Sequence, residues 1–127
     1  MQARRIQAVA ALFAALGVGC GAFGAHSLRD IVSPSDLDIW DKAVLYHLIH
    51  SLAALVIASQ AYAFRSPCRI AVLMLAAICV FSGSLYLLVL SGARWLGMIT
   101  PLGGLGFIVA WILLGIQLLK ASPKSEN

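Results

Sequence analysis

Two histidines, His47 and His50, lie three residues apart inside an apolar stretch of the sequence. On a helix this spacing places both imidazoles on nearly the same face. A neutral imidazole can bind zinc, copper, iron or haem, can relay protons, and can hydrogen-bond a neighbouring helix. Three interpretations therefore stay open. We prefer hydrogen bonding between helices, with Ser82, Tyr86 or Thr100 as partners, over a ligand or cofactor contact and over a proton relay.

The composition around this pair is typical of a membrane protein. The chain has 127 residues, of which 61% are hydrophobic and 11% are charged, whereas soluble domains carry about 25% charged residues. Four apolar runs occupy residues 6–25, 43–63, 70–92 and 98–119, and each is close to the ~20 residues that cross a bilayer as a helix. We predict an all-α fold, an integral membrane bundle of four transmembrane helices that forms a single domain over residues 1–127.

The basic residues indicate an orientation rather than a nucleic-acid partner. The formal net charge is +4. With four crossings, most Lys and Arg residues fall on the side of the two termini, namely Arg4, Arg5, Arg65, Arg69, Lys120 and Lys124. Basic residues are enriched in cytoplasmic segments, so both termini are predicted to be cytoplasmic. The protein is expected in the lipid bilayer of the cell inner membrane, without a nucleic-acid partner.

The cysteines and the first apolar run could suggest export signals or disulfides. Cys20 ends the segment LGVGC, as in a lipoprotein signal, but Gly17 stands where a large aliphatic residue is usual, so we expect a retained helix. The other cysteines are Cys68 and Cys79, and no Cys-x-x-Cys pair is present. A disulfide framework is therefore not expected.

Helical spacing sorts the residues of each run into faces. In the second run the two histidines share a face with Ala54 and Ala58, so they are expected to point at other helices and not at lipid. Small or polar stripes on all four runs are expected to meet in one common interface, because small residues let helices approach closely in lipid. The glycines predicted to serve helix packing are Gly17, Gly21, Gly24, Gly83, Gly103, Gly104 and Gly106.

Polar side chains gather in the half of the predicted bundle opposite the termini. At about 1.5 Å per residue, His47 lies roughly 9 Å and His50 roughly 14 Å past Asp41. The candidate polar cluster or ligand pocket comprises His26, Tyr46, His47, His50, Ser82, Ser84, Tyr86, Thr100 and Pro101. A structural zinc site needs four ligands, and the sequence leaves open whether His26 and Cys20 converge with the histidine pair. No particular cofactor is predicted, and the sequence leaves open whether a metal binds.

Four segments carry a resemblance to a known family: GAFGAHSL at 21–28, AVLYHLIHSLA at 43–53, FSGSLYLL at 81–88 and ITPLGGLGF at 99–107. Through them nearly the whole chain resembles the transmembrane protein 256 family, whose bacterial members form the domain of unknown function 423. The resemblance implies a small four-helix integral membrane protein, found in bacterial inner membranes and in eukaryotes, and implies no established activity. The matching residues are Gly21, Gly24, His26, Tyr46, His47, His50, Ser82, Gly83, Ser84, Tyr86, Pro101, Gly103 and Gly104.

Three functions are compatible with these features. The preferred hypothesis is a structural or accessory component that packs with itself, as a homo-oligomer, or with a larger membrane complex. The alternative is a binding protein that holds a lipid, quinone, haem or metal in a polar pocket. A small transporter or channel ranks below both, because no acidic residue lies deep in a predicted span to couple protons. No pair of nucleophile and base or of two acids is visible, so an enzyme is not expected.

Overall fold

Four long helices account for most of the described residues. The computed structural model describes residues 1–60 and 66–121, which contain no strand. Helix α1 (Gln2–Phe23) continues into a π-helical turn (Gly24–Leu28). Helices α2 (Pro34–Ser59) and α3 (Pro67–Ser91) follow, and a short 3-10 helix (Arg94–Met98) precedes α4 (Thr100–Lys120). Each long helix is long and apolar enough to span a membrane, which confirms the predicted all-α membrane fold.

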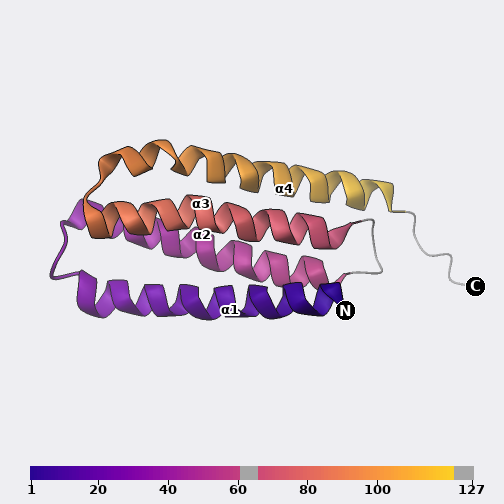
Figure 1. Cartoon of the computed structure of the whole chain (residues 1–127), viewed down its shortest axis with the longest axis horizontal. Coiled ribbons are helices and arrows are strands. Elements are labelled where there is room, and N and C mark those ends of the chain that lie inside the picture. Colours follow the sequence, from indigo (N-terminus) through magenta and orange to yellow (C-terminus); the bar gives the residue numbers. More distant parts are fainter. Residues whose placement is uncertain (61–65, 122–127) are drawn as a thin grey trace, which may run out of the picture.

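The helices form an open arrangement rather than a closed bundle. Helices α2 and α3 lie in the middle, whereas α1 and α4 lie at opposite edges, α1 against α2 and α4 against α3 (Figure 1). The prediction that all four stripes meet in one interface is therefore wrong. The physical reason is that each edge helix packs mainly on one central helix, so that the structure has successive pairwise interfaces. We call the end with the α1–α2 and α3–α4 connections the loop end, and the opposite end the terminal end.

Helix α2 begins well before the apolar run that predicted it. Ser33 is its N-cap, and its hydroxyl accepts a hydrogen bond of 3.1 Å from the backbone N–H of Asp36. Pro34 follows in the first turn, where its missing N–H costs nothing. The helix ends at Ser59, so the predicted residues 61–63 of the second span lie outside the described residues, as do Arg65 and Lys124.

An exposed ion pair joins the two connections at the loop end. Arg94 donates two hydrogen bonds to the carboxylate of Asp36, at 2.7 and 3.1 Å. Asp36 belongs to the first turn of α2, and Arg94 begins the 3-10 helix that leads into α4. The pair therefore ties the start of α2 to the segment between α3 and α4.

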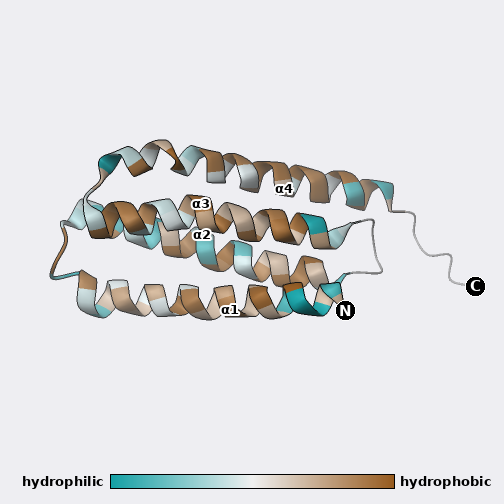
Figure 2. Cartoon of the chain, in the orientation of Figure 1, coloured by the Kyte–Doolittle hydropathy of each residue, from teal (hydrophilic) through white to brown (hydrophobic). Residues whose placement is uncertain are grey.

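Two apolar clusters fill the interior, and the histidine pair lies between them on α2. The cluster toward the terminal end includes Ile57, Ile70 and Met74, and the cluster at the loop end is built around Trp40 and Leu88. A hydrophilic band crosses the middle of α2 between the apolar segments (Figure 2). The opposite face of α2 is exposed as helical spacing predicts, with Leu45, Ile49, Leu52 and Val56 about half accessible. Burial therefore separates the lipid-facing side of α2 from the side that carries the polar groups.

Candidate functional site

His50 has both ring nitrogens engaged within the protein. The indole N–H of Trp111 in α4 donates to His50 Nε2 at 3.1 Å. Because an indole N–H can only donate, Nε2 is the acceptor and Nδ1 carries the proton, which it donates to the Tyr46 backbone carbonyl at 2.7 Å. Only 5% of His50 is exposed. His50 is thus a neutral imidazole that joins α2 to α4.

Aromatic side chains surround His50. The ring of Phe107 stacks on it with centroids 3.6 Å apart and planes inclined by 17°. The ring of Tyr46 is nearly parallel to that of His50, with centroids 5.8 Å apart, and lies tilted against the ring of Phe81 at 4.6 Å. These side chains and Trp111 line a groove of about 440 Å³ between α2, α3 and α4. The groove offers aromatic surface but no unpaired nitrogen on its histidine.

His47 lies on the side of α2 toward α1, away from α4, and only one of its two ring nitrogens has a hydrogen-bond partner. Its Nδ1 lies 3.0 Å from the hydroxyl of Tyr86 in α3. Its ring meets Phe13 of α1 edge-on, with centroids 6.1 Å apart. His47 is 2% exposed, yet its Nε2 has no hydrogen-bond partner. His47 also lines a second groove, of about 280 Å³, between α1 and α3.

Tyr86 links His47 to the loop end. Its hydroxyl lies beside the Cys20 thiol, and its ring packs 4.6 Å from that of Trp40. The Trp40 indole in turn donates a 2.8 Å hydrogen bond to the Cys20 carbonyl. Polar groups from α1, α2 and α3 therefore meet around one tyrosine.

The predicted serine and threonine partners bond elsewhere. Ser82 donates to the Ala43 carbonyl at 2.7 Å, and the hydroxyls of Ser84 and Thr100 lie 2.6 Å apart. Of the three expected partners of the histidines, only Tyr86 contacts one of them. Ser82 fastens α3 to α2, and the Ser84–Thr100 pair fastens α3 to α4. Pro101 is exposed in the first turn of α4 and starts that helix.

The structure does not bring the three histidines together. His26 is exposed in the π-helical turn at the loop end, whereas His47 and His50 are buried along α2. Within residues 1–60 and 66–121 no group of three or more His, Cys, Asp or Glu side chains is arranged to hold a metal ion. The described His, Cys, Asp and Glu side chains are therefore not arranged as a four-ligand zinc site.

The glycines of α1 allow its close approach to α2. A Cβ on Gly17 would lie 2.8 Å from the side chain of Leu48, and one on Gly24 would lie 2.6 Å from the indole of Trp40. Gly21 is also tight, at 3.3 Å from Val44 for an added Cβ. These contacts show why small residues occupy this face of α1.

On α4, Gly103 is the most constrained glycine. A Cβ there would lie 2.7 Å from the backbone Cα of Phe81 and closer still to its nitrogen. At Gly106 it would lie 3.0 Å from the Ala77 Cβ, and at Gly104 it would make ordinary contact. Gly83, by contrast, has no atom within 4 Å of an added Cβ, because it faces the groove beside His47.

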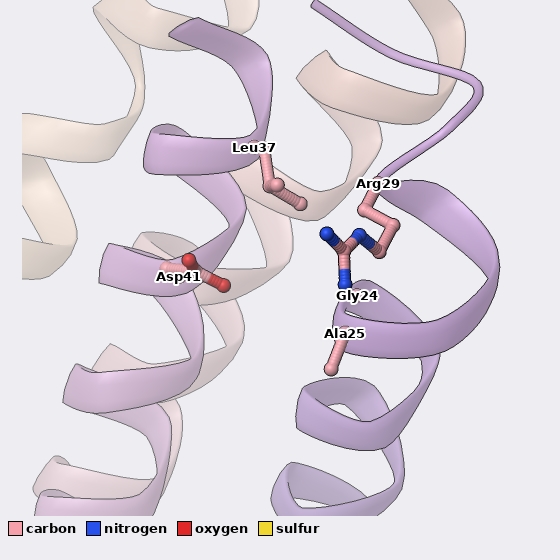
Figure 3. Close-up of a pocket in the computed structure, with 5 residues that line it drawn as sticks. All are labelled: Gly24, Ala25, Arg29, Leu37 and Asp41. Atoms are coloured by element: carbon pink, nitrogen blue, oxygen red, sulfur yellow. The ribbon is translucent and has the colours of Figure 1, made fainter. Parts of the chain in front are cut away.

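A third, smaller groove lies at the loop end. Its volume is about 220 Å³, and it is lined by Gly24, Ala25, Arg29, Leu37 and Asp41. The side chains of Arg29 and Asp41 approach it from opposite sides (Figure 3). Both side chains are exposed, so this groove is a charged surface feature. It is separate from the buried polar layer, by which we mean His47, His50, Ser51, Ser82, Ser84 and Thr100.

Sequence reasoning missed the aromatic partners Trp111, Phe107 and Phe13. Trp111 lies in an apolar run, where a tryptophan is expected to use its N–H when a partner is available. That rule predicts a bond but does not name the partner, because helices α2 and α4 are far apart in the sequence. The predicted polar cluster therefore did not include Trp111, which donates the hydrogen bond to His50 Nε2.

Four apolar helices around a buried polar layer define a small polytopic membrane protein. The family described as "Protein of unknown function (DUF423)" matches residues 20–104, and the chain belongs to that family, which confirms the resemblance read from its motifs. The UPF0382 membrane protein SAB0533 of Staphylococcus aureus (strain bovine RF122) is 45% identical over 111 residues, covering 87% of this chain and 91% of the relative. The UPF0382 membrane protein YwdK of Bacillus subtilis (strain 168) is 42% identical over 113 residues, covering 87% and 92%. No solved structure matches the chain.

Proposed function

We propose that this protein is a structural or accessory membrane component that packs against another transmembrane helix through the outer face of α1. A second copy of the same chain is the simplest partner, and a larger membrane complex is the other. The observation that carries the proposal is a second stripe of small residues on α1, distinct from the one that contacts α2.

This outer stripe is exposed along four turns of α1. It consists of Ala8, Ala11, Ala15, Gly19 and Ala22, all of them exposed. At about 100° per residue these positions fall within an arc of roughly 80°. No atom lies within 4 Å of a Cβ added to Gly19. Small residues are favoured where transmembrane helices pack closely, so a lipid-facing stripe of this kind supports docking of a further helix.

The buried polar groups support a structural role rather than a relay. Among the described residues, the only buried side-chain nitrogen or oxygen atoms without a partner are His47 Nε2 and Gln117 Oε1. Both nitrogens of His50 are engaged, which leaves no free site for accepting and passing a proton. All four aspartates of the sequence precede Lys42, so the part of α2 that carries the two histidines contains no carboxylate. We therefore include neither catalysis nor proton-coupled transport in the proposed function.

We also propose that the protein lies in the cell inner membrane with both termini in the cytoplasm. The start of α1 and the end of α4 lie at the same end of the molecule (Figure 1). That end carries Arg4, Arg5, Arg69 and Lys120 among the described residues. Since basic residues favour the cytoplasmic side, the terminal end is assigned to it.

Two matched glycine variants test the packing proposal. Gly19 on the outer stripe and Gly115 on the exposed face of α4 are both exposed, and no atom lies within 4 Å of a Cβ added at either position, so the two leucine variants are a matched pair. We expect wild type and Gly115→Leu to associate in lipid nanodiscs, as measured by single-molecule photobleaching. Gly19→Leu should weaken association by roughly tenfold or more, because a branched side chain holds the helices apart.

The same experiment can contradict the proposal. A wild-type protein that is monomeric and purifies from its own membrane without a partner would overturn it. Equal association of the Gly19→Leu and Gly115→Leu variants would show that the outer stripe is not the contact. A loss of folded helix in Gly19→Leu, monitored by circular dichroism, is not expected because the position is exposed and no atom of the described residues lies within 4 Å of the new Cβ.

A further inference from the structure

We propose that the groove between α1 and α3 binds the oxygenated ring of a membrane-soluble quinone or quinol, with His47 Nε2 hydrogen-bonded to a ring oxygen. Binding is the whole of this proposal, which includes no redox step. It concerns a surface different from the outer stripe of α1 and does not depend on association of the chain.

The unpaired nitrogen of His47 is the first observation. Only 2% of this side chain is exposed, and its Nε2 has no partner. The Phe13 backbone carbonyl lies near the ring, but no donor or acceptor of the described residues meets Nε2 with hydrogen-bond geometry. Buried polar atoms are nearly always hydrogen-bonded, because leaving one unpaired is costly. His50, three residues away, has partners on both nitrogens, so the two histidines of α2 differ in this respect.

The groove at His47 is the second observation. Its volume is about 280 Å³, near the lower limit of roughly 300 Å³ for small-molecule sites. Phe13 and Leu16 of α1 and Tyr86 of α3 supply much of its apolar lining, with His47 from α2 as a polar group. An apolar cavity with one well-placed polar group is the usual form of a site for a small organic ligand.

Glycine keeps this groove open. Gly83 lines it, and no atom lies within 4 Å of a Cβ added there. Any larger side chain at this position would project into the space beside His47. A larger side chain introduced at Gly83 would therefore occupy the groove, and its Cβ would meet no other side chain or helix.

The depth of His47 favours a quinone over a phospholipid. His47 lies six residues beyond Asp41 on α2, roughly 9 Å deeper into the bilayer, whereas the oxygen atoms of phospholipids are concentrated at the interface. An acyl chain reaches this depth but offers no hydrogen-bonding atom. A quinone carries its oxygens on an apolar ring, which the rings of Phe13 and Tyr86 can contact face-on or edge-on. Its hydrocarbon tail would leave the groove on the lipid side.

Both oxidation states of such a ring suit His47. A quinone carbonyl accepts a hydrogen bond from Nε2 when Nε2 carries the proton. A quinol hydroxyl donates to Nε2 when the proton is on Nδ1 instead. The Tyr86 hydroxyl at Nδ1 can accept or donate, so it accommodates either tautomer of the imidazole.

The experiment uses the full chain in nanodiscs of phosphatidylethanolamine and phosphatidylglycerol, with a decyl-substituted benzoquinone as the probe. Quenching of tryptophan fluorescence measures binding, since Trp40 packs against Tyr86. Wild type should show saturable quenching. Gly83→Leu, which fills the groove, should weaken binding by roughly tenfold or more, while Gly115→Leu on α4 should bind as wild type does.

Nitrogen-15 NMR of the histidine side chains gives a second readout on the unmodified protein. The probe should shift the Nε2 signal of His47, assigned with a His47→Gln variant, and leave that of His50 in place. Equal quenching in Gly83→Leu and wild type would overturn the proposal, as would an unchanged His47 signal at saturating probe. A His47 nitrogen that is already bonded to water or to the Phe13 carbonyl in the probe-free protein, and stays so, would also overturn it.

Discussion

Replacement of Gly103 by alanine should separate α4 from α3. A Cβ at this position would lie 2.7 Å from the Cα of Phe81, and contacts shorter than 3.4 Å already require the neighbour to move. The helices must therefore shift apart by at least 0.7 Å, the difference between these two distances, and further to clear the nearer Phe81 nitrogen. The obstructing atoms belong to the backbone of α3, so no side-chain rotation can relieve the contact.

The expected cost of Gly103→Ala follows from this geometry. Overpacking a close-packed interface costs about 1–3 kcal/mol, and a gap of 0.5–1 Å forfeits a quarter to a half of the dispersion energy of the separated atoms. Because the clash is with backbone, we expect an overpacking cost near the upper end, about 3 kcal/mol. The helix preference of alanine over glycine offsets up to about 1 kcal/mol of it, so the free energy of unfolding should fall by about 2–3 kcal/mol.

Gly115→Ala is the matched control on the same helix. No atom lies within 4 Å of a Cβ added at Gly115, and alanine is favoured over glycine in a helix by up to about 1 kcal/mol. The control should be as stable as wild type or more stable. Reversible unfolding by SDS titration in mixed micelles, followed by circular dichroism, measures both. A Gly103→Ala protein within about 0.5 kcal/mol of its wild type would refute the close approach of α4 to α3.

Three further predictions concern the polar layer and the loop end. Trp111→Phe removes the donor to His50 Nε2, leaves a buried acceptor unpaired, and should lower the free energy of unfolding by about 1–3 kcal/mol in the same titration; an unchanged value would mean that the bond does not form. Ser84→Ala and Thr100→Ala, combined in a double-mutant cycle, should show a coupling of about 0.6–1.7 kcal/mol, whereas additive effects would exclude a direct bond between the two hydroxyls. Gly24→Ala should displace the Trp40 indole, which would lie 2.6 Å from the new Cβ, and change the near-ultraviolet circular dichroism; an unaltered spectrum would contradict this contact.

Much of the fold follows from hydrophobicity and spacing. The four apolar runs predict the four helices because a bilayer selects for uninterrupted apolar segments. Helical spacing also placed the histidines of α2 inward and Leu45 and Leu52 outward. The start of α2 at Pro34 escaped hydropathy, since its first turns are polar and are fixed by the Ser33 cap. Hydropathy detects the part of a helix inside the bilayer and not its extension beyond.

The arrangement of the helices was less predictable. Stripes of small residues on all four runs suggested one shared interface. A stripe indicates that a helix packs closely against another, but it does not indicate which helix that is. Gly103 meets the backbone of Phe81 in α3, and Gly17 meets Leu48 in α2, so these stripes serve different pairs. Gly83 was predicted for packing on the same basis and instead faces the open groove beside His47.

The sequence predicted many of the residues of the polar cluster, but it did not predict which of them form hydrogen bonds with one another. Tyr86 was among the expected partners of the histidines and contacts His47. Ser82 bonds a backbone carbonyl instead, because hydroxyls in membrane helices readily find nearby carbonyl groups. His26 shares the motif pattern but lies in the exposed turn after α1, since its position depends on a π-helical turn that spacing at 100° per residue does not anticipate.

Cross-linking along α1 in native membranes tests the central claim most directly. Single cysteines would be placed at each position from 8 to 22 in a chain whose natural cysteines are replaced by alanine. The proposal predicts cross-linked products that peak at Ala8, Ala11, Ala15, Gly19 and Ala22, the exposed small positions, and fall at Val9 and Leu16, which lie outside the arc of the stripe. Cross-linking that is absent throughout, or that follows no helical period, would contradict packing through the outer face of α1.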